Sequence, residues 1–362
     1  MEIFNINKRI YINRYNKKKL FLLKINFVII MLTFIINHFN YKKIGVIGLA
    51  HSQNIGNNLV KYAISIQLRK LGFDPYIVGR KYPNHDISFL QNYTKLKVIN
   101  YFQEINETDY DILMVNSDQT WRKWDIFFYD IAFLKFAENW NKPKFIYAAS
   151  LGLNNWQFNK KDEMIAKILL KNFTGISIRE KGSIKLIESN LGFKPKFVLD
   201  PTLLIDKKYY LQLINNYKND IFIDKSFIFI YTVTNSTTLK NYINKIKEKY
   251  NYKIYSINSY TKNNIKKFIY GIYNCKAVIT DSFHGTIFSL IFKKSFISFV
   301  YEENGRERFN TLKEVFNLQK RIYDCQSNPD PKILDIPLNI NQKVLRKLKI
   351  KSINFLKQNL MK

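Results

Sequence analysis

The sequence has little cysteine, little arginine and no long uninterrupted apolar run. Two cysteines in 362 residues, Cys275 and Cys325, are too few for a disulfide framework or a zinc site, and they fit a reducing compartment. Hydrophobic residues make up 46% and charged residues 24%, which excludes a disordered tail protein, a collagen-like repeat and a polytopic membrane protein. At roughly 150 residues per domain, the length predicts two domains with a sizeable core.

The charge is strongly positive, with 58 Lys plus Arg against 28 Asp plus Glu, or +30. Such a balance suits an anionic partner: nucleic acid, an acidic membrane surface or a phosphorylated substrate. Most of the cations are Lys, in a chain crowded with Lys, Asn, Ile, Tyr and Phe, a mixture that biased codon usage also produces. Because zinc-finger spacing, RNP-type aromatics and heptads are all absent from the sequence, we predict no nucleic-acid partner and a solvated Lys-rich surface.

Residues 1–43 form a basic and apolar N-terminal extension. Lys17, Lys18 and Lys19 precede an apolar run over 20–36 that Lys24 interrupts, and no small-residue cleavage site follows it. The clean apolar stretch is shorter than the ~20 residues that cross a bilayer. Three interpretations stay open: an anchor that makes peripheral membrane contact, a weak signal-anchor, or an extension without function.

From Ile44 onward, apolar runs of strand length alternate with segments of helical spacing. We predict strands over 44–47, 76–78, 111–115, 145–149, 175–178 and 197–199, then a break over 206–225, then strands over 227–231, 252–257, 277–280 and 296–300. The fold class is therefore α/β: two Rossmann-like domains, 44–205 and 206–330, whose parallel sheets face a central cleft at the strands' carboxyl ends. Residues 331–362 are basic and helical, and we expect them to pack back across the hinge.

The most informative segment runs from Ala277 to Phe288, where a predicted strand meets a polar turn and then a helix from Thr286. Free N–H groups at a helix start make an anion site, and His284 suits acid–base chemistry or a phosphate contact. Gly285 permits close backbone approach. The simpler alternative is that Asp281 and Ser282 cap the helix beside a passive histidine.

Three further polar turns follow predicted strands. They carry Ser117, Asp118 and Gln119; Arg179 and Glu180; and Asp200 before Pro201. Each has a simple explanation as a helix cap, a surface ion pair or a turn. Because carboxyl ends of parallel strands share one edge of a sheet, the convergence of four such turns favours a site.

Arginine gives an independent indication, since ten arginines stand against 48 lysines. A guanidinium matches phosphate and carboxylate geometry in a way that an ammonium does not. Arg179 ends a strand, and Arg308 and Arg306 follow the last one. We rank Arg179 first, Arg308 second and Arg306 third, the alternative being surface pairs with nearby glutamates.

Together these segments resemble the polysaccharide pyruvyl transferase family. The matching blocks are Asn-Ile-Gly-Asn at 54–57, Ser-Asp-Gln-Thr-Trp at 117–121, Tyr-Ala-Ala-Ser-Leu-Gly at 147–152, Arg-Glu-Lys at 179–181, Asp-Pro-Thr-Leu-Leu at 200–204 and Thr-Asp-Ser-Phe-His-Gly at 280–285. Their order and spacing agree over roughly 44–320. One departure is Asn116, where the family usually has glycine, so a side chain is expected beside the cleft.

The resemblance implies a GT-B-like fold and transfer of a pyruvyl group from phosphoenolpyruvate to a sugar of a surface polysaccharide or exopolysaccharide. It implies a cytoplasmic enzyme, at or near the inner face of the membrane, acting on a glycan or lipid-linked sugar without a metal or other cofactor. His284 and Asp118 are the candidate catalytic residues. The candidate substrate-binding residues are Asn54, Gly56, Asn57, Ser117, Gln119, Arg179, Ser282, Gly285, Thr286 and Arg308.

Two alternatives stay open at this point. The same cleft could serve a glycosyltransferase that uses a nucleotide sugar, or the chain could be a glycan-assembly partner without catalysis.

Overall fold

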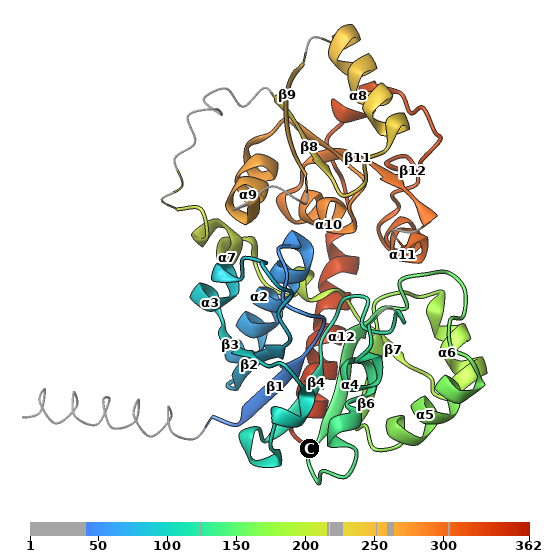
Figure 1. Cartoon of the computed structure of the whole chain (residues 1–362). Helices are drawn as coiled ribbons and strands as arrows, with labels where there is room; N and C mark the ends of the chain where they lie inside the picture. Colours follow the sequence, from blue (N-terminus) through green and yellow to red (C-terminus); the bar gives the residue numbers. More distant parts are fainter. Residues whose placement is uncertain are drawn as a thin grey trace, which may run out of the picture. The chain divides into compact units, whose positions relative to one another are not determined.

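The computed structural model describes residues 41–123, 125–215, 217, 227–250, 252–258, 264–302 and 305–362. The N-terminal extension through residue 40 and most of the break over 206–225 lie outside these ranges, so the predictions for them stay predictions. Residues 43–362 form one unit with two parallel sheets (Figure 1).

The first sheet has seven parallel strands in the order β3-β2-β1-β4-β5-β6-β7. They are β1 (Lys43–Ile47), β2 (Asp74–Gly79), β3 (Lys95–Val98), β4 (Ile112–Val115), β5 (Lys144–Ala149), β6 (Gly175–Ile178) and β7 (Lys196–Phe197). The helices of this part are α2 (Ile55–Lys70), α3 (Ser88–Tyr93), α4 (Phe128–Phe133), α5 (Lys160–Leu170), α6 (Ser183–Leu191) and α7 (Lys207–Gln212). Strand order reverses between β1 and β4, as in a Rossmann fold.

The second sheet has five parallel strands in the order β12-β11-β10-β8-β9. They are β8 (Phe227–Thr232), β9 (Lys253–Asn258), β10 (Ala277–Thr280), β11 (Ser295–Val300) and β12 (Ile322–Asp324). The helices are α8 (Thr237–Tyr250), α9 (Asn264–Asn274), α10 (Phe283–Phe292), α11 (Arg306–Phe316) and α12 (Gln342–Leu360). Order reverses between β8 and β10, so each sheet has a switch point, the place where doubly wound folds bind ligands.

One apolar cluster joins the two sheets. It includes the inner face of α2, the segment around Tyr210, and α10. Tyr210 touches the rings of Tyr62 on α2, at 6.2 Å between centroids, and Phe288 on α10, at 4.8 Å. The two helices are thereby held on one core, and each begins just after a strand at its own sheet's switch point.

The C-terminal helix α12 returns from the second sheet to the first (Figure 1). Phe355 packs on Phe145 and Tyr147 of β5, and the Ser352 hydroxyl accepts a hydrogen bond from the Leu199 amide at 2.9 Å. The C-terminal segment therefore packs back across the hinge, as predicted.

The predicted α/β class with two facing parallel sheets is confirmed. Nine predicted strands are present at their places, and the tenth, predicted over 197–199, is the two-residue strand β7 at Lys196–Phe197. The domain boundaries stay predictions. Two edge strands, β3 and β12, were not predicted. Helix α10 begins at Phe283 rather than Thr286, because Ser282 caps it and its hydroxyl accepts the Gly285 amide. His284 and Gly285 therefore lie inside the first helical turn and not in a preceding loop.

Candidate active site

A cavity of about 410 Å³ lies where the carboxyl ends of the two sheets meet. Both switch points contribute to its wall: the segments after β1 and β4 from one sheet, and those after β8 and β10 from the other. Its lining residues are Leu49, Ala50, Ser52, Asn54, Gly56, Asn57, Tyr82, Asp118, Gln119, Arg122, Tyr231, Val233, Asp281, Ser282, Phe283, His284 and Arg308. We call this cavity the central pocket.

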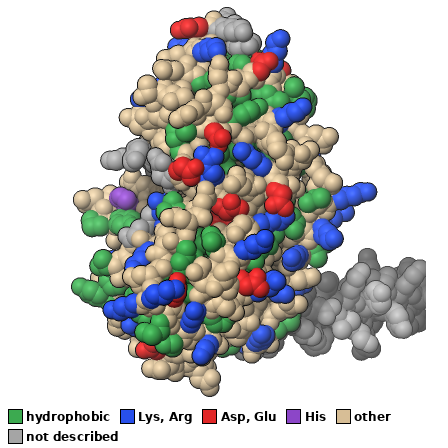
Figure 2. Space-filling model, turned by 90° about the vertical axis from the view of Figure 1, so that its right-hand side faces the viewer, with side chains coloured by type: hydrophobic (Ala, Val, Ile, Leu, Met, Phe, Trp, Pro, Cys, Tyr) green, Lys and Arg blue, Asp and Glu red, His purple; other side chains and the backbone are tan. Residues whose placement is uncertain are grey.

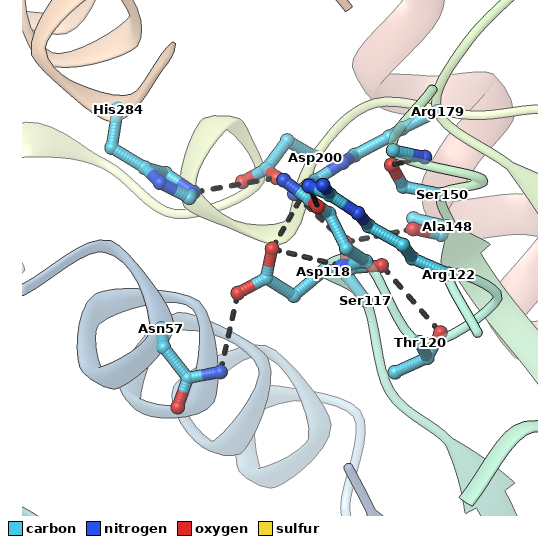
Figure 3. Close-up of polar contacts among 12 residues, drawn as sticks. Asn57, Ser117, Asp118, Thr120, Arg122, Ala148, Ser150, Arg179, Asp200 and His284 are labelled. Atoms are coloured by element: carbon cyan, nitrogen blue, oxygen red, sulfur yellow. Dashed lines mark hydrogen bonds and ion pairs between the residues drawn. The ribbon is translucent and has the colours of Figure 1, made fainter. Parts of the chain in front are cut away.

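Asp118 is held in place by its own backbone and by three donors. It follows β4 with φ at 95°, a left-handed conformation that costs a non-glycine residue free energy and is commonly found at functional sites. Its carboxylate accepts hydrogen bonds from the Asn57 side chain at 3.2 Å and the Gln119 amide at 2.9 Å, and it pairs with Arg179 at 3.1 Å (Figure 3).

Arg179 bridges two carboxylates beneath the pocket. Besides Asp118, its guanidinium pairs with Asp200 at 2.5 Å and lies 3.4 Å from the Ser117 hydroxyl. All three charged side chains are nearly inaccessible to solvent, so the bridge is a buried network rather than a surface pair. Arg179 is therefore placed to hold Asp118, and it does not line the central pocket.

These charges fix the ionisation of the carboxylates. Burial alone would raise the pKa of Asp118, but the positive charges of Arg179, His284 and Arg308 outweigh it and lower the pKa to about 2. Burial likewise opposes ionisation of Asp200, yet nearby His284 and Arg179 hold its pKa far below the ordinary value. Both groups are carboxylates at neutral pH and have no proton to donate.

His284 reaches the pocket from the first turn of α10. Its Nε2 lies 3.8 Å from Oδ2 of Asp200, an ion-pair distance that exceeds a hydrogen bond (Figure 3). Across the pocket, its ring is packed against Gly56 of α2, where an added Cβ would lie 2.0 Å from Nδ1. The imidazole thus stands between the two switch points, with a fixed carboxylate on one side.

Arg308 supplies a guanidinium in the pocket wall. It and Arg179 lie on the Phe283 ring, at 4.8 and 4.9 Å from the ring centroid. Burial and then repulsion from Arg179 lower the pKa of Arg308 to about 10, which still leaves it charged at neutral pH. Arg306, by contrast, pairs with Glu302 and Asp324 near the surface, as the alternative of surface pairs predicts for it.

The structure brings most of the predicted substrate-binding residues to the central pocket and leaves four out. Asn54, Gly56, Asn57, Gln119, Ser282 and Arg308 line it, as do both candidate catalytic residues. The four that do not are Ser117, Arg179, Gly285 and Thr286. Ser117 donates to the Ala148 carbonyl, the Gly285 amide donates to Ser282, and Thr286 bonds Ser282 and Ser298. Their polar groups serve the local structure, which the sequence alone did not reveal.

Lys61 and His51 form a buried pair behind one wall of the pocket that sequence analysis missed. The Lys61 ammonium donates to the Leu49 carbonyl at 2.8 Å and lies 3.1 Å from Nδ1 of His51. Burial lowers the pKa of Lys61 to about 7, although Asp118 opposes this shift. Burial, and then the Lys61 charge, lower the pKa of His51 to about 2. Lys61 lies one helical turn after Asn57 on α2, which is the only sequence signal that links it to Asp118.

Asn116, the departure from the family pattern, does not line the pocket. It is buried, and its Cβ lies in contact range of a Cβ built on Gly48.

Among the residues that the structure describes, no group of three or more His, Cys, Asp or Glu side chains could hold a metal ion. In the same ranges, no helix is long and apolar enough to span a membrane. On the face shown in Figure 2, Lys and Arg are dispersed among acidic and uncharged side chains.

Two parallel sheets with a pocket at both switch points define a protein of the GT-B-like class. A solved structure of a UDP-N-acetylglucosamine 2-epimerase is similar, with a TM-score of 0.50, 10% identity, and coverage of 88% of this chain and 96% of that one. A putative UDP-N-acetylglucosamine 2-epimerase from Listeria monocytogenes gives a TM-score of 0.48 at 13% identity, over 85% and 90% of the chains. These likenesses concern the fold alone.

The sequence model of the family described as polysaccharide pyruvyl transferase matches residues 54–303, well over half of the chain. The protein belongs to this transferase family, and the predicted resemblance is confirmed. No curated protein sequence matches it.

Proposed function

We propose that this protein transfers a pyruvyl group from phosphoenolpyruvate to a sugar of a surface polysaccharide or exopolysaccharide. Family membership supports a transferase that acts in polysaccharide biosynthesis. The observation that carries the finer proposal is the charge pattern of the central pocket: the guanidiniums of Arg308 and Arg122 and the imidazole of His284 lie around the Asp118 carboxylate, which stays ionised.

The donor is a small acid with a phosphate and a carboxylate, so its site needs fixed positive charge. Arg308 meets that need from the pocket wall, and its planar fork suits either anionic group. The imidazole of His284 lies in the same pocket wall. Arg179 is a positioning residue that does not contact the donor, because its guanidinium is paired with the carboxylates of Asp118 and Asp200.

The chemistry needs a proton donor for the methylene carbon of phosphoenolpyruvate. Asp118 and Asp200 are ionised and are not suited to donate it. The Asp281 carboxylate in the pocket wall accepts hydrogen bonds from the amides of Val233 and Thr234, so we assign the acid to His284. Adding a proton to the methylene carbon makes the methyl group and leaves an oxocarbenium-like centre on the adjacent carbon. The fixed negative charge of Asp118 stabilises that cation, since its carboxylate is already oriented by three donors.

Two sugar hydroxyls complete the ketal. The first attacks the cationic carbon and loses its proton to Asp118 or to the imidazole that has just given one up. The carbon–oxygen bond to phosphate then breaks, and inorganic phosphate leaves a second oxocarbenium-like cation. A second hydroxyl attacks this cation, and its proton is taken up by the departing phosphate. One pyruvyl ketal and one phosphate form for each phosphoenolpyruvate consumed, and no redox step is required.

The test is donor consumption by the full-length protein with a panel of acceptor glycans. We expect phosphate release with phosphoenolpyruvate and a ketal on the acceptor, and at least a hundredfold loss of turnover in His284→Gln. Arg308→Met is expected to raise the KM for phosphoenolpyruvate strongly. Arg306→Met, two residues away on α11 and paired at the surface, is the matched control and should behave like the wild type.

Two other outcomes would overturn the proposal. Release of nucleotide from a nucleotide sugar, with phosphoenolpyruvate inert, would make the protein a glycosyltransferase. Binding of phosphoenolpyruvate or sugar without turnover across the panel would make it a glycan-assembly partner.

We place the reaction in the cytoplasm, where phosphoenolpyruvate is formed, near the inner face of the membrane. The basic and apolar sequence of residues 1–43 supports the membrane contact. Deleting residues 1–41 should lower partition onto anionic lipid vesicles and leave transferase activity intact.

A further inference from the structure

Three exposed apolar side chains follow three strands in one half of the first sheet. Tyr101 comes after β3, Tyr82 after β2 and Ile126 after β4, with 61%, 47% and 88% of their surface exposed. Because the sheet is parallel, all three lie at the carboxyl edge that also forms the central pocket. Large apolar side chains gathered at a functional edge commonly mark a binding surface.

Contacts connect the loops after β2, β3 and β4, and Ile126 precedes Phe127 in the last of these loops. The Arg80 guanidinium lies 4.1 Å from the centre of the Phe127 ring, and the Tyr101 ring meets Phe127 at 6.3 Å. Arg80 also donates to the Asn100 carbonyl at 3.0 Å, which ties the loop after β2 to the loop after β3. We call Tyr82, Tyr101, Ile126 and Phe127 the aromatic ledge.

The ledge is continuous with the pocket through Tyr82, which lines it. The Tyr82 amide donates to the His51 carbonyl at 3.1 Å, and its ring packs on His85 at 5.4 Å, so its position is fixed from two sides. Burial and then the charge of Asp125 raise the pKa of Tyr82, while Arg80 opposes the shift, so both charged groups act on its hydroxyl.

The composition of the ledge favours a carbohydrate over a lipid tail. Aromatic faces suit the apolar C–H face of a pyranose ring, and the interleaved Arg80 and Asp125 suit its hydroxyls. A lipid tail would gain contacts with the aromatic faces alone, because it has no polar group to meet Arg80 or Asp125. The surface is also long for a single sugar, because it runs from the pocket across three loops.

We propose that the aromatic ledge binds the sugars next to the acceptor residue, so the enzyme selects an oligosaccharide over a single sugar. The inference rests on the proposed function, because it assumes that the acceptor enters the central pocket. The reacting sugar lies in the pocket beside Tyr82, and the following sugars lie on Phe127 and Tyr101.

The experiment compares methyl glycosides of glucose, galactose and mannose with the linear tetrasaccharides of the same sugars. In the wild type, we expect kcat/KM for the reactive sugar to be roughly three- to tenfold higher for the tetrasaccharide, the range that one aromatic contact provides. Tyr101→Ala should abolish that gain and leave the value for the methyl glycoside unchanged. Tyr273→Ala, an exposed tyrosine on α9 that is 40% accessible, is the matched control and should keep the gain.

Saturation-transfer NMR of the same tetrasaccharides with the full-length protein separates this inference from the proposed function. Contacts to the non-reducing and internal sugars that Tyr101→Ala removes would support the ledge even if no pyruvyl transfer occurs. Equal kcat/KM for both acceptor lengths, or an unchanged gain in Tyr101→Ala, would overturn it while leaving the function in place. Loss of vesicle binding in Tyr101→Ala, with no effect on sugars, would overturn it in favour of a lipid contact.

Discussion

Gly56 of α2 and His284 of α10, two helices that follow strands of different sheets, meet with no room for a side chain between them. A Cβ on Gly56 would lie 2.0 Å from Nδ1 of His284, closer than any real contact allows. The first turn of α2 therefore fixes the imidazole from the side opposite Asp200. Glycine is required at position 56 because the His284 ring approaches its Cα so closely. The backbone angles of Gly56 would themselves allow another residue.

Gly56→Ala should consequently inactivate the enzyme without unfolding it. Alanine favours the helix, but its methyl group must displace the imidazole, and a misplacement of about 1 Å costs on the order of a hundredfold in kcat. Steady-state kinetics beside a thermal melt would measure both effects. Gly48→Ala is the control, because its methyl group would meet Asn116 at an ordinary 3.5 Å. Wild-type kcat in Gly56→Ala would contradict the placement of His284.

Removing the Arg179 guanidinium should destabilise the protein strongly. Arg179→Met would leave Asp118 and Asp200 buried without their partner, which typically costs about 3–5 kcal/mol in the free energy of unfolding. Arg306→Met, at a partly exposed pair, should cost about 1 kcal/mol or less. Urea unfolding measures the free energy of unfolding of both variants. An equal loss in the two would show that the buried bridge of Arg179 contributes no more to stability than the partly exposed pair of Arg306.

The Lys61–His51 pair should make stability depend on pH near neutrality. In the unfolded chain Lys61 keeps its proton to its ordinary pKa of 10.5, whereas the folded chain releases it near pH 7. Between these values the unfolded chain holds more protons, so the free energy of unfolding rises with pH, at most by about 1.4 kcal/mol per pH unit. Urea unfolding between pH 7.5 and 8.5 should show that slope in the wild type.

Lys61→Met is the matched variant for this slope, because it keeps the length of the side chain and removes the titrating group. The part of the slope that comes from Lys61 should disappear between pH 7.5 and 8.5, a window well below the ordinary pKa of the tyrosines and other lysines. An identical slope in Lys61→Met would mean that another group titrates there.

The interior of both sheets was predictable because buried parallel strands are short apolar runs, such as Ile112–Val115 and Ala277–Thr280. Of the four edge strands, β7 and β9 were predicted, whereas β3 and β12 were not. Lys95–Val98 alternates lysine with apolar residues and is mostly exposed, and β12 has only three residues. A strand at the edge of a sheet is partly exposed to solvent, so its sequence need not be a continuous apolar run and is harder to tell from a loop.

The site was predictable as a set of strand ends but not as a set of contacts. Asp118 and Arg179 are 61 residues apart, and nothing local shows that the guanidinium turns inward to two carboxylates instead of toward a substrate. Lys61 was missed for a related reason: on α2 it looks like an ordinary solvated lysine, and only the loop after β1 buries it. Pairing across elements requires the three-dimensional fold.

The central claim is that an acid in this pocket protonates the methylene carbon of phosphoenolpyruvate before a sugar hydroxyl attacks. The most direct measurement is mass spectrometry of the glycan after reaction in D₂O with the wild-type protein and phosphoenolpyruvate. The account predicts a ketal whose methyl group carries one deuterium, and almost none of that product from His284→Gln. A ketal formed without deuterium, or one formed at the wild-type rate by His284→Gln, would contradict it.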